Sequence, residues 1–553
     1  MSWKIQLPLF FLATLFSCQQ AQEQEQASVN QPNIIYILAD DMGYSDLGCY
    51  GSEIQTPYLD RLANDGMRFT QFYNAARCCP SRASLLTGLY PHQAGMGSMT
   101  QDMGHPSYIG RIKENATTIA EVLGQNNYNT YQVGKWHVGD ARNDWPDRKG
   151  FDQHFTFLNG ASSYYNLWPY REGRDSMKMA FNGEQYRPGD NFYMTDAFSD
   201  HAVQFIEEDG DKPFFMFLAY TAPHWPLHAL PEDIAKYKGK YQMGWDELRL
   251  QRWQKMKELG VISKDIPLSE RSPDLPAWEE IADEDRGTWD TRMALYAAVI
   301  DRMDQGIGKI IQKLEEKGEL DNTLIVFLSD NGGSPERMLN TSYPTDGEPG
   351  SDRSFPTYWA HWANVSNTPF RFYKGWVQEG GIATPFIAHW PKSIPKGKIN
   401  TKTKGHIMDL LPTALAAAGA SYPEKIGERN IIPTTGQSLM AAFQGEEPTG
   451  HEILCWEHEG ARAIRKGDWK LVANNYDILS NSWETNRQWR LFNLKEDPNE
   501  LYDIFDDHQD YAQELIKDYD DWAETTGVLP PEAFVEMKAA YKKRMNEKPA
   551  EKY

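Results

Sequence analysis

Cysteine is scarce in this chain, with five in 553 residues, and positive charge is outweighed by negative charge. The few cysteines are neither dense nor regularly spaced, which argues against a disulfide framework. Lysine and arginine number 56 against 78 aspartates and glutamates, giving a formal net charge of −22. That balance argues against nucleic-acid binding, because phosphate contacts need a basic face. A site for an anionic substrate would need to supply positive charge locally.

The apolar runs of the sequence are short. The run LPLFFLATLF, residues 7–16, follows Lys4 and is too short to span a bilayer. With Ser17 and Cys18 after it, the pattern predicts a signal peptide over residues 1–17 and export from the cytosol. LFSC resembles a bacterial lipobox, in which Cys18 would carry a lipid anchor in a membrane. Phe16 is bulky for that pattern, so cleavage nearby by an ordinary signal peptidase is the alternative.

The polar, glutamine-rich residues 18–32 would form the tether of such a lipoprotein. We therefore expect the protein in the periplasm, or at the outer membrane and cell surface as a lipoprotein. The folded part of the chain is expected to begin at about Asn33.

Apolar residues are plentiful, at 40% of the chain, so a large core can form. Buried strands are predicted where apolar runs begin at Asn33, Tyr128, Lys212 and Asn322, and helical patterns such as 117–127 and 301–320 separate them. This alternation predicts an α/β fold for residues 33–445, with a large, mostly parallel sheet between layers of helices. Residues 446–553 predict a smaller α+β domain with an antiparallel sheet.

Each of the four predicted strands ends in polar residues. These are Asp40 with Asp41, Lys135 with His137, His224, and Asp330 with Asn331. Ligands bind at the carboxyl ends of strands in open α/β sheets, so the four groups are expected to converge on one crevice. Any one of them alone could equally be a turn or a helix cap.

Two of these groups are adjacent pairs of hard oxygen donors. The four residues Asp40, Asp41, Asp330 and Asn331 suit Ca²⁺ or Mg²⁺, and the sequence has no His or Cys cluster with zinc spacing. The alternative is that the adjacent carboxylates bind no metal and that local turns relieve the repulsion between them.

The stretch ARCCPSRASLLTG, residues 76–88, predicts the start of a helix. Pro80 fits a first helical turn and Gly88 a helix end, which places Cys78 just ahead of the helix N-terminus. Unpaired N–H groups there favour an anion, so a nucleophile at Cys78 would meet an anionic group already held in place. A buried, inert cysteine is the alternative.

CCPSRASLLTG resembles the signature of the type I, formylglycine-dependent sulfatases of the alkaline phosphatase superfamily. In that family a maturation enzyme oxidises the cysteine that precedes any residue and Pro-Ser-Arg to formylglycine (3-oxoalanine). The motifs ADDMG, GKWHVG, APHWP, SDNGG and YKGWVQEGG follow the same family pattern in order, and the resemblance runs from about Asn33 to Val472. In this register Cys78 is modified and Cys79 fills the variable position. Ala383 stands where many members have arginine, which puts the subfamily in doubt.

The resemblance implies a role for each matching residue. One Ca²⁺ per chain would be held by Asp40, Asp41, Asp330, Asn331 and the formylglycine made from Cys78. Arg82 would hold the formylglycine, His137 would hydrogen-bond its hydroxyl, Lys135 and Lys374 would grip sulfate oxygens, and His224 would protonate the leaving alcohol.

The implied activity is hydrolysis of sulfate monoesters by a formylglycine hydrate. A sulfated carbohydrate is the expected substrate, with exo-type desulfation of algal oligosaccharides such as ulvan fragments as one form. Aromatic residues in 342–370 would offer faces for sugar rings, or belong to the core. The long excursion 230–289 would wall the pocket or cover the surface. Alternatives are a general arylsulfatase, a phosphonate or phosphate ester hydrolase, and a non-enzymatic sulfated-glycan-binding protein, the last of which would not need Cys78, Arg82, His137 and His224 together.

Overall fold

The computed structural model describes residues 31–172, 176–474, 476–477, 482–483 and 488–547. The predicted signal peptide, residues 1–17, and the tether up to residue 30 lie outside these ranges. Gln31 and Pro32, which the sequence assigns to the tether, contact the folded part: the Gln31 amide donates to the Ala418 carbonyl at 2.8 Å, and the Pro32 carbonyl accepts from the Tyr128 hydroxyl at 3.0 Å. Within the described ranges, no helix has the length and apolarity that crossing a membrane requires.

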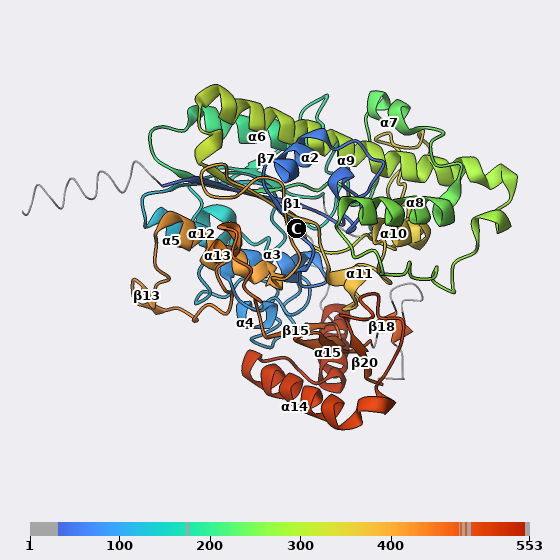
Figure 1. Ribbon diagram of the computed structural model, residues 1–553. Helices are drawn as coiled ribbons and strands as arrows, with labels where there is room; N and C mark the ends of the chain where they lie inside the picture. The colour runs from blue at the N-terminus through green and yellow to red at the C-terminus, as the bar shows by residue number, and fades with distance from the viewer. Residues whose placement is uncertain (1–30, 173–175, 475, 478–481, 484–487, 548–553) are drawn as a thin grey trace, which may run out of the picture.

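A ten-stranded sheet forms the centre of the molecule (Figure 1). Its order is β11 (Lys398–Asn400), β2 (Met67–Phe69), β10 (Phe386–His389), β9 (Thr323–Ser329), β1 (Asn33–Ala39), β8 (Phe214–Ala219), β4 (Asn129–Lys135), β5 (Gln153–Phe157), β6 (Met179–Phe181) and β7 (Glu184–Tyr186). The four strands predicted from apolar runs are β1, β4, β8 and β9. They are neighbours in the order β9-β1-β8-β4 and pair in parallel, so this part of the prediction is confirmed.

Strand β1 shows why the sheet is buried on both faces. All seven of its residues are buried; Ile35 and Ile37 belong to the apolar cluster on one face, while Ile34, Tyr36 and Leu38 belong to the cluster on the other. Because side chains alternate across a strand, an uninterrupted apolar run fits only a strand covered on both sides.

Helices cover both faces of the sheet (Figure 1). On one face lie α2 (Pro57–Asn64), α6 (Met194–Glu208) and α9 (Asp283–Lys317), and on the other α3 (Cys78–Thr87), α5 (Ile119–Gly124) and α12 (Leu410–Ala418). The shorter helices are α4 (Pro91–Ala94), α7 (Pro231–Tyr237), α10 (Trp359–Ser366), α11 (Glu379–Ile382) and α13 (Met440–Phe443), with the longer α8 (Gly244–Leu259) beside α10. The predicted sandwich of a mostly parallel sheet between helical layers is confirmed.

A smaller antiparallel sheet follows toward the C-terminus, as predicted. Its order is β15 (Ile453–His458), β16 (Ala461–Lys466), β17 (Trp469–Ala473) and β20 (Arg490–Asn493). Helix α14 (Gln509–Thr526) packs its Ala512, Leu515 and Tyr519 on the sheet. Helix α15 (Pro531–Glu547) lies beside this small sheet in Figure 1, and its Phe534 contacts Met103 and Tyr108.

Short paired strands complete the described chain: β3 (Phe72–Tyr73) with β12 (Gly405–His406), β13 (Lys425–Ile426) with β14 (Arg429–Asn430), and β18 (Tyr476–Asp477) with β19 (Ser482–Trp483). The cysteines of this part, Cys49, Cys78, Cys79 and Cys455, are free and buried.

Candidate active site

The polar groups that follow the central strands converge, as the sequence predicts. Neighbouring parallel strands end at the same edge of the sheet, so Asp40, Lys135 and Asp330 come together although they lie far apart in the sequence. The structure brings all the predicted site residues to this edge in buried positions, namely Asp40, Asp41, Cys78, Arg82, Lys135, His137, His224, Asp330, Asn331 and Lys374.

Three of the four predicted oxygen-donor residues, Asp41, Asp330 and Asn331, contact one another. The Asn331 amide donates to Asp41 Oδ1 at 2.7 Å, and the Asp41 backbone N–H donates to Asp330 Oδ1 at 3.3 Å. Asp40 Oδ1 and Asn331 Oδ1 are buried and have no hydrogen-bond partner in the described part of the chain. Buried oxygens left in this state are costly unless a ligand satisfies them, so this donor set fits a hard divalent cation.

Cationic side chains surround these carboxylates. Lys135 Nζ lies 2.6 Å from Asp40 Oδ2, and Arg82 Nη2 lies 2.8 Å from Asp330 Oδ2 and 3.8 Å from Asp40 Oδ1. Lys374 Nζ lies 2.8 Å from Asp41. Burial raises the pKa of Asp40 well above its usual range, although Lys135 and Arg82 favour its charged form. The site therefore holds positive charge that an anion could share.

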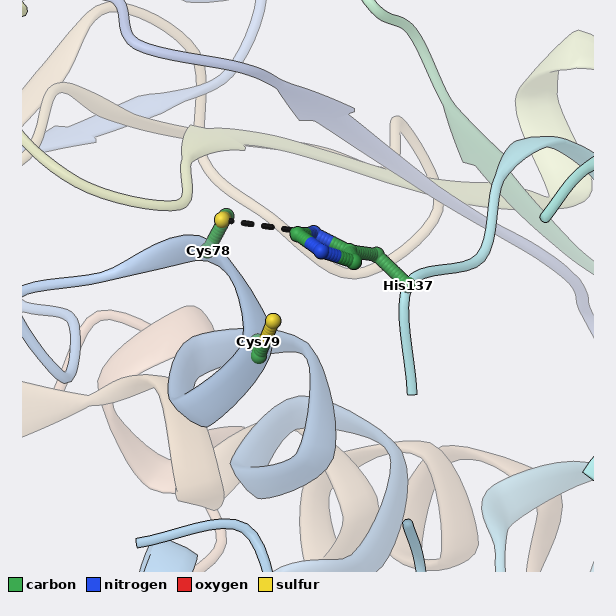
Figure 2. A group of neighbouring side chains, drawn as sticks. All are labelled: Cys78, Cys79 and His137. Carbon is green, nitrogen blue, oxygen red and sulfur yellow. Dashed lines mark hydrogen bonds between the residues drawn. The ribbon is translucent and has the colours of Figure 1, made fainter. Parts of the chain in front are cut away.

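Cys78 is the first residue of α3, one step further into the helix than the sequence predicts; Arg77 occupies the N-cap position, and Gly88 ends the helix with a φ of 68°. The Cys78 sulfur lies 3.4 Å from His137 Nδ1, and Figure 2 shows this contact as the dashed line. The Cys79 thiol lowers the pKa of Cys78 by a hydrogen bond, and Lys135 and His137 lower it further against the effect of burial.

Cys79 lies beside Cys78 in the first turn of α3, and the pKa of its thiol is shifted in the opposite direction. Burial raises the pKa of Cys79 well above its usual range. The ligand atoms of Cys78, Cys79 and His137 all lie within 4.8 Å of one another. Of the two thiols, Cys78 is the more acidic and contacts His137, as a reactive position requires.

Three residues at this edge of the sheet have a strained backbone. Asp41 has a φ of 69°, Ala76 of 63° and His137 of 57°, all in the left-handed region that non-glycine residues rarely adopt. Such conformations persist where the surrounding fold enforces them, and they cluster at functional sites.

His224 and Lys374 meet on the other side of the carboxylates. His224 Nε2 lies 3.2 Å from Lys374 Nζ and 3.4 Å from Asp41 Oδ2, and Nδ1 lies 2.7 Å from the Trp225 carbonyl oxygen. Nδ1 therefore carries a hydrogen in the neutral ring, which leaves Nε2 free to accept from the Lys374 ammonium. Burial lowers the pKa of His224 to about 3, although Asp41 favours its charged form.

The sequence did not predict several residues that line the cleft above Cys78. This cleft has a volume of about 240 Å³, and its walls include Arg77, Tyr170, Trp225 and Glu336. Arg77 could have been noticed because it directly precedes Cys78. Glu336 follows the SDNGG motif in a loop, where a charged residue is normally a surface residue, so the sequence offered no clear sign of it.

The aromatic side chains of residues 342–370 are mostly core. Four of these rings are buried in the apolar cluster that also contains Ile35 and Ile37 of β1, namely Tyr343, Tyr358, Trp362 and Phe370. The expectation that this segment offers its rings to sugars is therefore wrong for these four residues. The aromatic residues that do line the cleft, Tyr170 and Trp225, come from elsewhere.

A second, larger hollow of about 1230 Å³ lies beside the cleft, and Met177 lines both. Trp168, 41% exposed, lines it together with Tyr165, Tyr186 and Arg187. The excursion 230–289 contributes α7 residues to this hollow and none to the cleft around Cys78 in the described chain. Residues from 230–238, at the start of the excursion, therefore border the neighbouring hollow.

Comparison with known proteins agrees with this geometry. The family model described as Sulfatase matches residues 32–420, and the model described as N-sulphoglucosamine sulphohydrolase, C-terminal, matches residues 370–524. The chain is 33% identical over 545 residues to an uncharacterized sulfatase of Schizosaccharomyces pombe, with 92% of this chain and 97% of that protein covered. It is 36% identical over 442 residues to an arylsulfatase of Klebsiella aerogenes, with 75% and 92% covered.

Among solved structures, the chain resembles Ps i-CgsB in complex with k-i-k-neocarrahexaose. The TM-score is 0.66 at 28% sequence identity, and the alignment covers 94% of this chain and 98% of that one. Fold, family model and full-length relatives agree along nearly the whole described chain. The chain therefore belongs to the sulfatase family and is a sulfuric ester hydrolase.

Proposed function

We propose that this enzyme removes sulfate from carbohydrates, using formylglycine made from Cys78 and one bound Ca²⁺. The observation that carries the proposal is the cleft itself: Cys78 lies against His137 at the entrance to a buried group of carboxylates, lysines and a second histidine. The resemblance of CCPSRASLLTG to the sulfatase signature supports modification at residue 78 by a maturation enzyme.

The oxygens of Asp40, Asp41, Asp330 and Asn331, together with the side chain of residue 78, would hold the cation. Asp40 Oδ1 and Asn331 Oδ1, buried without a hydrogen-bond partner in the described chain, support this assignment. Carboxylate and amide oxygens suit Ca²⁺ and suit zinc poorly. When bound, the ion supplies positive charge that favours an ionised hydroxyl and an anionic substrate.

Formylglycine, when hydrated, carries two hydroxyl groups on one carbon, which neither a cysteine nor a serine does. Residues of the chain would bind the sulfate group and hydrogen-bond the side chain of residue 78. Lys135 and Lys374 direct their ammonium groups into the carboxylate cluster, where they would also face the oxygens of a bound sulfate. His137 Nδ1, 3.4 Å from the residue 78 sulfur, is placed to hydrogen-bond the side chain at this position.

His224 would protonate the leaving oxygen from Nε2, which must first take up a proton because Nδ1 carries the hydrogen of the neutral ring; Asp41 favours that charged form. Its Nε2 lies within 3.2 Å of Lys374 Nζ, so the ring stands beside the group that would hold sulfate. The Trp225 carbonyl, 2.7 Å from Nδ1, fixes the ring orientation. Proton delivery matters most for a sugar alcohol, which is a poor leaving group.

A carbohydrate substrate is supported by the resemblance to Ps i-CgsB, whose structure is a complex with k-i-k-neocarrahexaose. The cleft of about 240 Å³ is small, and the hollow beyond Met177 offers about 1230 Å³ for further sugar units. Algal or host polysaccharides, with ulvan fragments among them, are candidate sources. The 36% identity to an arylsulfatase favours a second candidate, a small aryl sulfate.

The test is sulfate release, measured by ion chromatography, from sulfated oligosaccharides and from 4-nitrophenyl sulfate. His224→Ala is expected to slow a sugar sulfate far more than the aryl sulfate, whose phenol leaves without an acid. His508→Ala, an exposed histidine on the C-terminal domain, is the control. Equal losses on both substrates would contradict the role of His224. Turnover of aryl sulfates with none of the glycans would leave a general arylsulfatase.

Export and lipidation at Cys18 are also proposals, and they rest on residues outside the described ranges. Labelled palmitate should be incorporated into the full-length chain and lost in Cys18→Ala. A chain that is exported without label would support ordinary signal-peptidase cleavage instead.

A further inference from the structure

Glu336 is a half-buried carboxylate in the wall of the catalytic cleft, where an anionic substrate must bind. We infer that Glu336 is a positioning residue, which holds the Lys374 ammonium and the Trp225 indole in place and affects turnover through Lys374. The inference rests on the proposed role of Lys374 in binding sulfate.

Both oxygens of Glu336 are engaged. Oε2 accepts from Trp225 Nε1 at 2.7 Å, from the Ser334 hydroxyl at 3.1 Å and from Lys374 Nζ at 3.3 Å. Oε1 accepts from Arg77 Nη2 at 3.0 Å. The side chain is 16% exposed, against 2% for Lys374, so these contacts are shielded from solvent and differ from a surface ion pair.

The neighbouring cations explain how a carboxylate can stand in a cleft that binds an anion. A lone carboxylate in the cleft would repel a sulfate ester, but Glu336 lies between the two cations Arg77 and Lys374. Arg77 and Lys374 offset the charge of Glu336, so this carboxylate does not stand alone against an anion, and the contacts hold each side chain in one place.

Lys374 has a second carboxylate partner, Asp41, at 2.8 Å. With Glu336 at 3.3 Å on another side, the ammonium is held between two anions and kept within 3.2 Å of His224 Nε2. Removing the Glu336 charge would leave Asp41 as the anion that attracts Lys374, and the ammonium would shift toward the proposed metal ligands.

Trp225 links Glu336 to His224 by a second route. Its indole N–H donates to Glu336, while its backbone carbonyl lies 2.7 Å from His224 Nδ1. Glu336 thus fixes the far end of the residue whose backbone orients the proposed acid.

The test uses 4-nitrophenyl sulfate, so it does not depend on the identity of the natural glycan. Glu336→Gln keeps the shape and one acceptor but loses the charge, and kcat/KM is expected to fall roughly 10- to 100-fold, as is typical when a residue behind a reactive group is changed. Glu336→Asp keeps the charge on a shorter stem and should retain more activity. Glu121→Gln is the matched control: Glu121 lies on α5, has a side-chain exposure of 24% and is ion-paired to Arg429 on β14, and its change should leave kcat/KM unaltered.

The decisive readout is the double variant Glu336→Gln/Lys374→Ala. 4-Nitrophenyl sulfate does not need the acid His224, so the route through Trp225 should not affect its turnover. If Glu336 acts through Lys374, the double variant loses no more activity on this substrate than Lys374→Ala alone. Losses that multiply, or wild-type activity in Glu336→Gln while Lys374→Ala is impaired, would overturn the inference. Wild-type activity in Lys374→Ala would instead contradict the proposed function, so the two failures are distinguishable. Melting temperatures of all variants separate lost activity from lost folding.

Discussion

Lys470 joins the C-terminal sheet to the catalytic part of the molecule through a buried ion cluster. Its Nζ lies 2.7 Å from Glu379 Oε1 and 3.0 Å from Glu500 Oε1, and the exposed fractions of the three side chains are 0%, 5% and 1%. Glu379 begins α11, just beyond the loop that carries Lys374. Lys470→Met would leave two buried carboxylates facing each other without a cation.

The expected loss in the free energy of unfolding is large. Removing one partner of a buried ion pair costs about 3–5 kcal/mol, because the remaining charge stays buried. At about 2.1 cal/mol/K per residue, cooperative unfolding of 553 residues changes the entropy by about 1.2 kcal/mol/K. The melting temperature of Lys470→Met, measured by calorimetry, should therefore fall by about 2–4 °C.

The loss should grow as the pH rises. Burial raises the pKa of Glu500 to about 7 even though Lys470 lowers it. A folded pKa above the unfolded value means stability that is present at low pH and lost as the pH rises through 7, and removing Lys470 strengthens this loss. Lys517→Met, which breaks an exposed pair with Asp521 on α14, is the control and should not change the melting temperature. If the melting temperature of Lys470→Met falls no further than that of Lys517→Met, the buried ion cluster does not stabilise the fold as argued.

Three further predictions concern the metal, the neighbouring hollow and pH. Asp330→Ala should lose both calcium and activity, as measured by elemental analysis of the dialysed protein; stoichiometric zinc without calcium in the wild type would contradict the assignment. Trp168→Ala should raise KM for an oligosaccharide substrate roughly 2- to 10-fold, at ~0.5–1.5 kcal/mol per aromatic contact, and leave 4-nitrophenyl sulfate unaffected. The exposed Tyr502, changed to Ala, is its control, and equal effects would remove the hollow from substrate binding. Burial raises the pKa of Asp304 to about 7, so its contribution to stability is present at low pH and lost as the pH rises through 7, by about 4 kcal/mol. The stability of Asp304→Asn relative to the wild type should therefore rise between about pH 4 and 7, starting from a lower value because Asn keeps one of the two oxygens that accept from the Tyr58 and Leu59 N–H groups. A pH-independent difference in melting temperature would contradict this.

The central strands and the site at their ends could be predicted because one physical cause produces both. Strands buried on two faces need unbroken apolar runs, and parallel neighbours end at one edge, so Asp40, Lys135, His224 and Asp330 were expected together. The structure confirms this in the pairing of β9, β1, β8 and β4.

The edge strands and the cleft walls could not be predicted in the same way. Strand β10 has four residues and runs antiparallel between β9 and β2, and so short a segment carries little periodicity. Trp362 and Phe370 are aromatic residues near Lys374 in the sequence, but composition does not distinguish a core ring from a ring that faces a ligand. Glu336 depends on contacts with Arg77, Trp225 and Lys374, which only the folded chain brings together.

The central claim is that Cys78 becomes the formylglycine nucleophile and that Cys79 does not. The direct measurement is mass spectrometry of the tryptic fragment that begins at residue 78, from protein made with the maturation enzyme, together with turnover of Cys78→Ala and Cys79→Ala. We predict formylglycine at residue 78, an unmodified Cys79, no turnover in Cys78→Ala and retained turnover in Cys79→Ala. Modification at residue 79, or full activity in Cys78→Ala, would contradict the account.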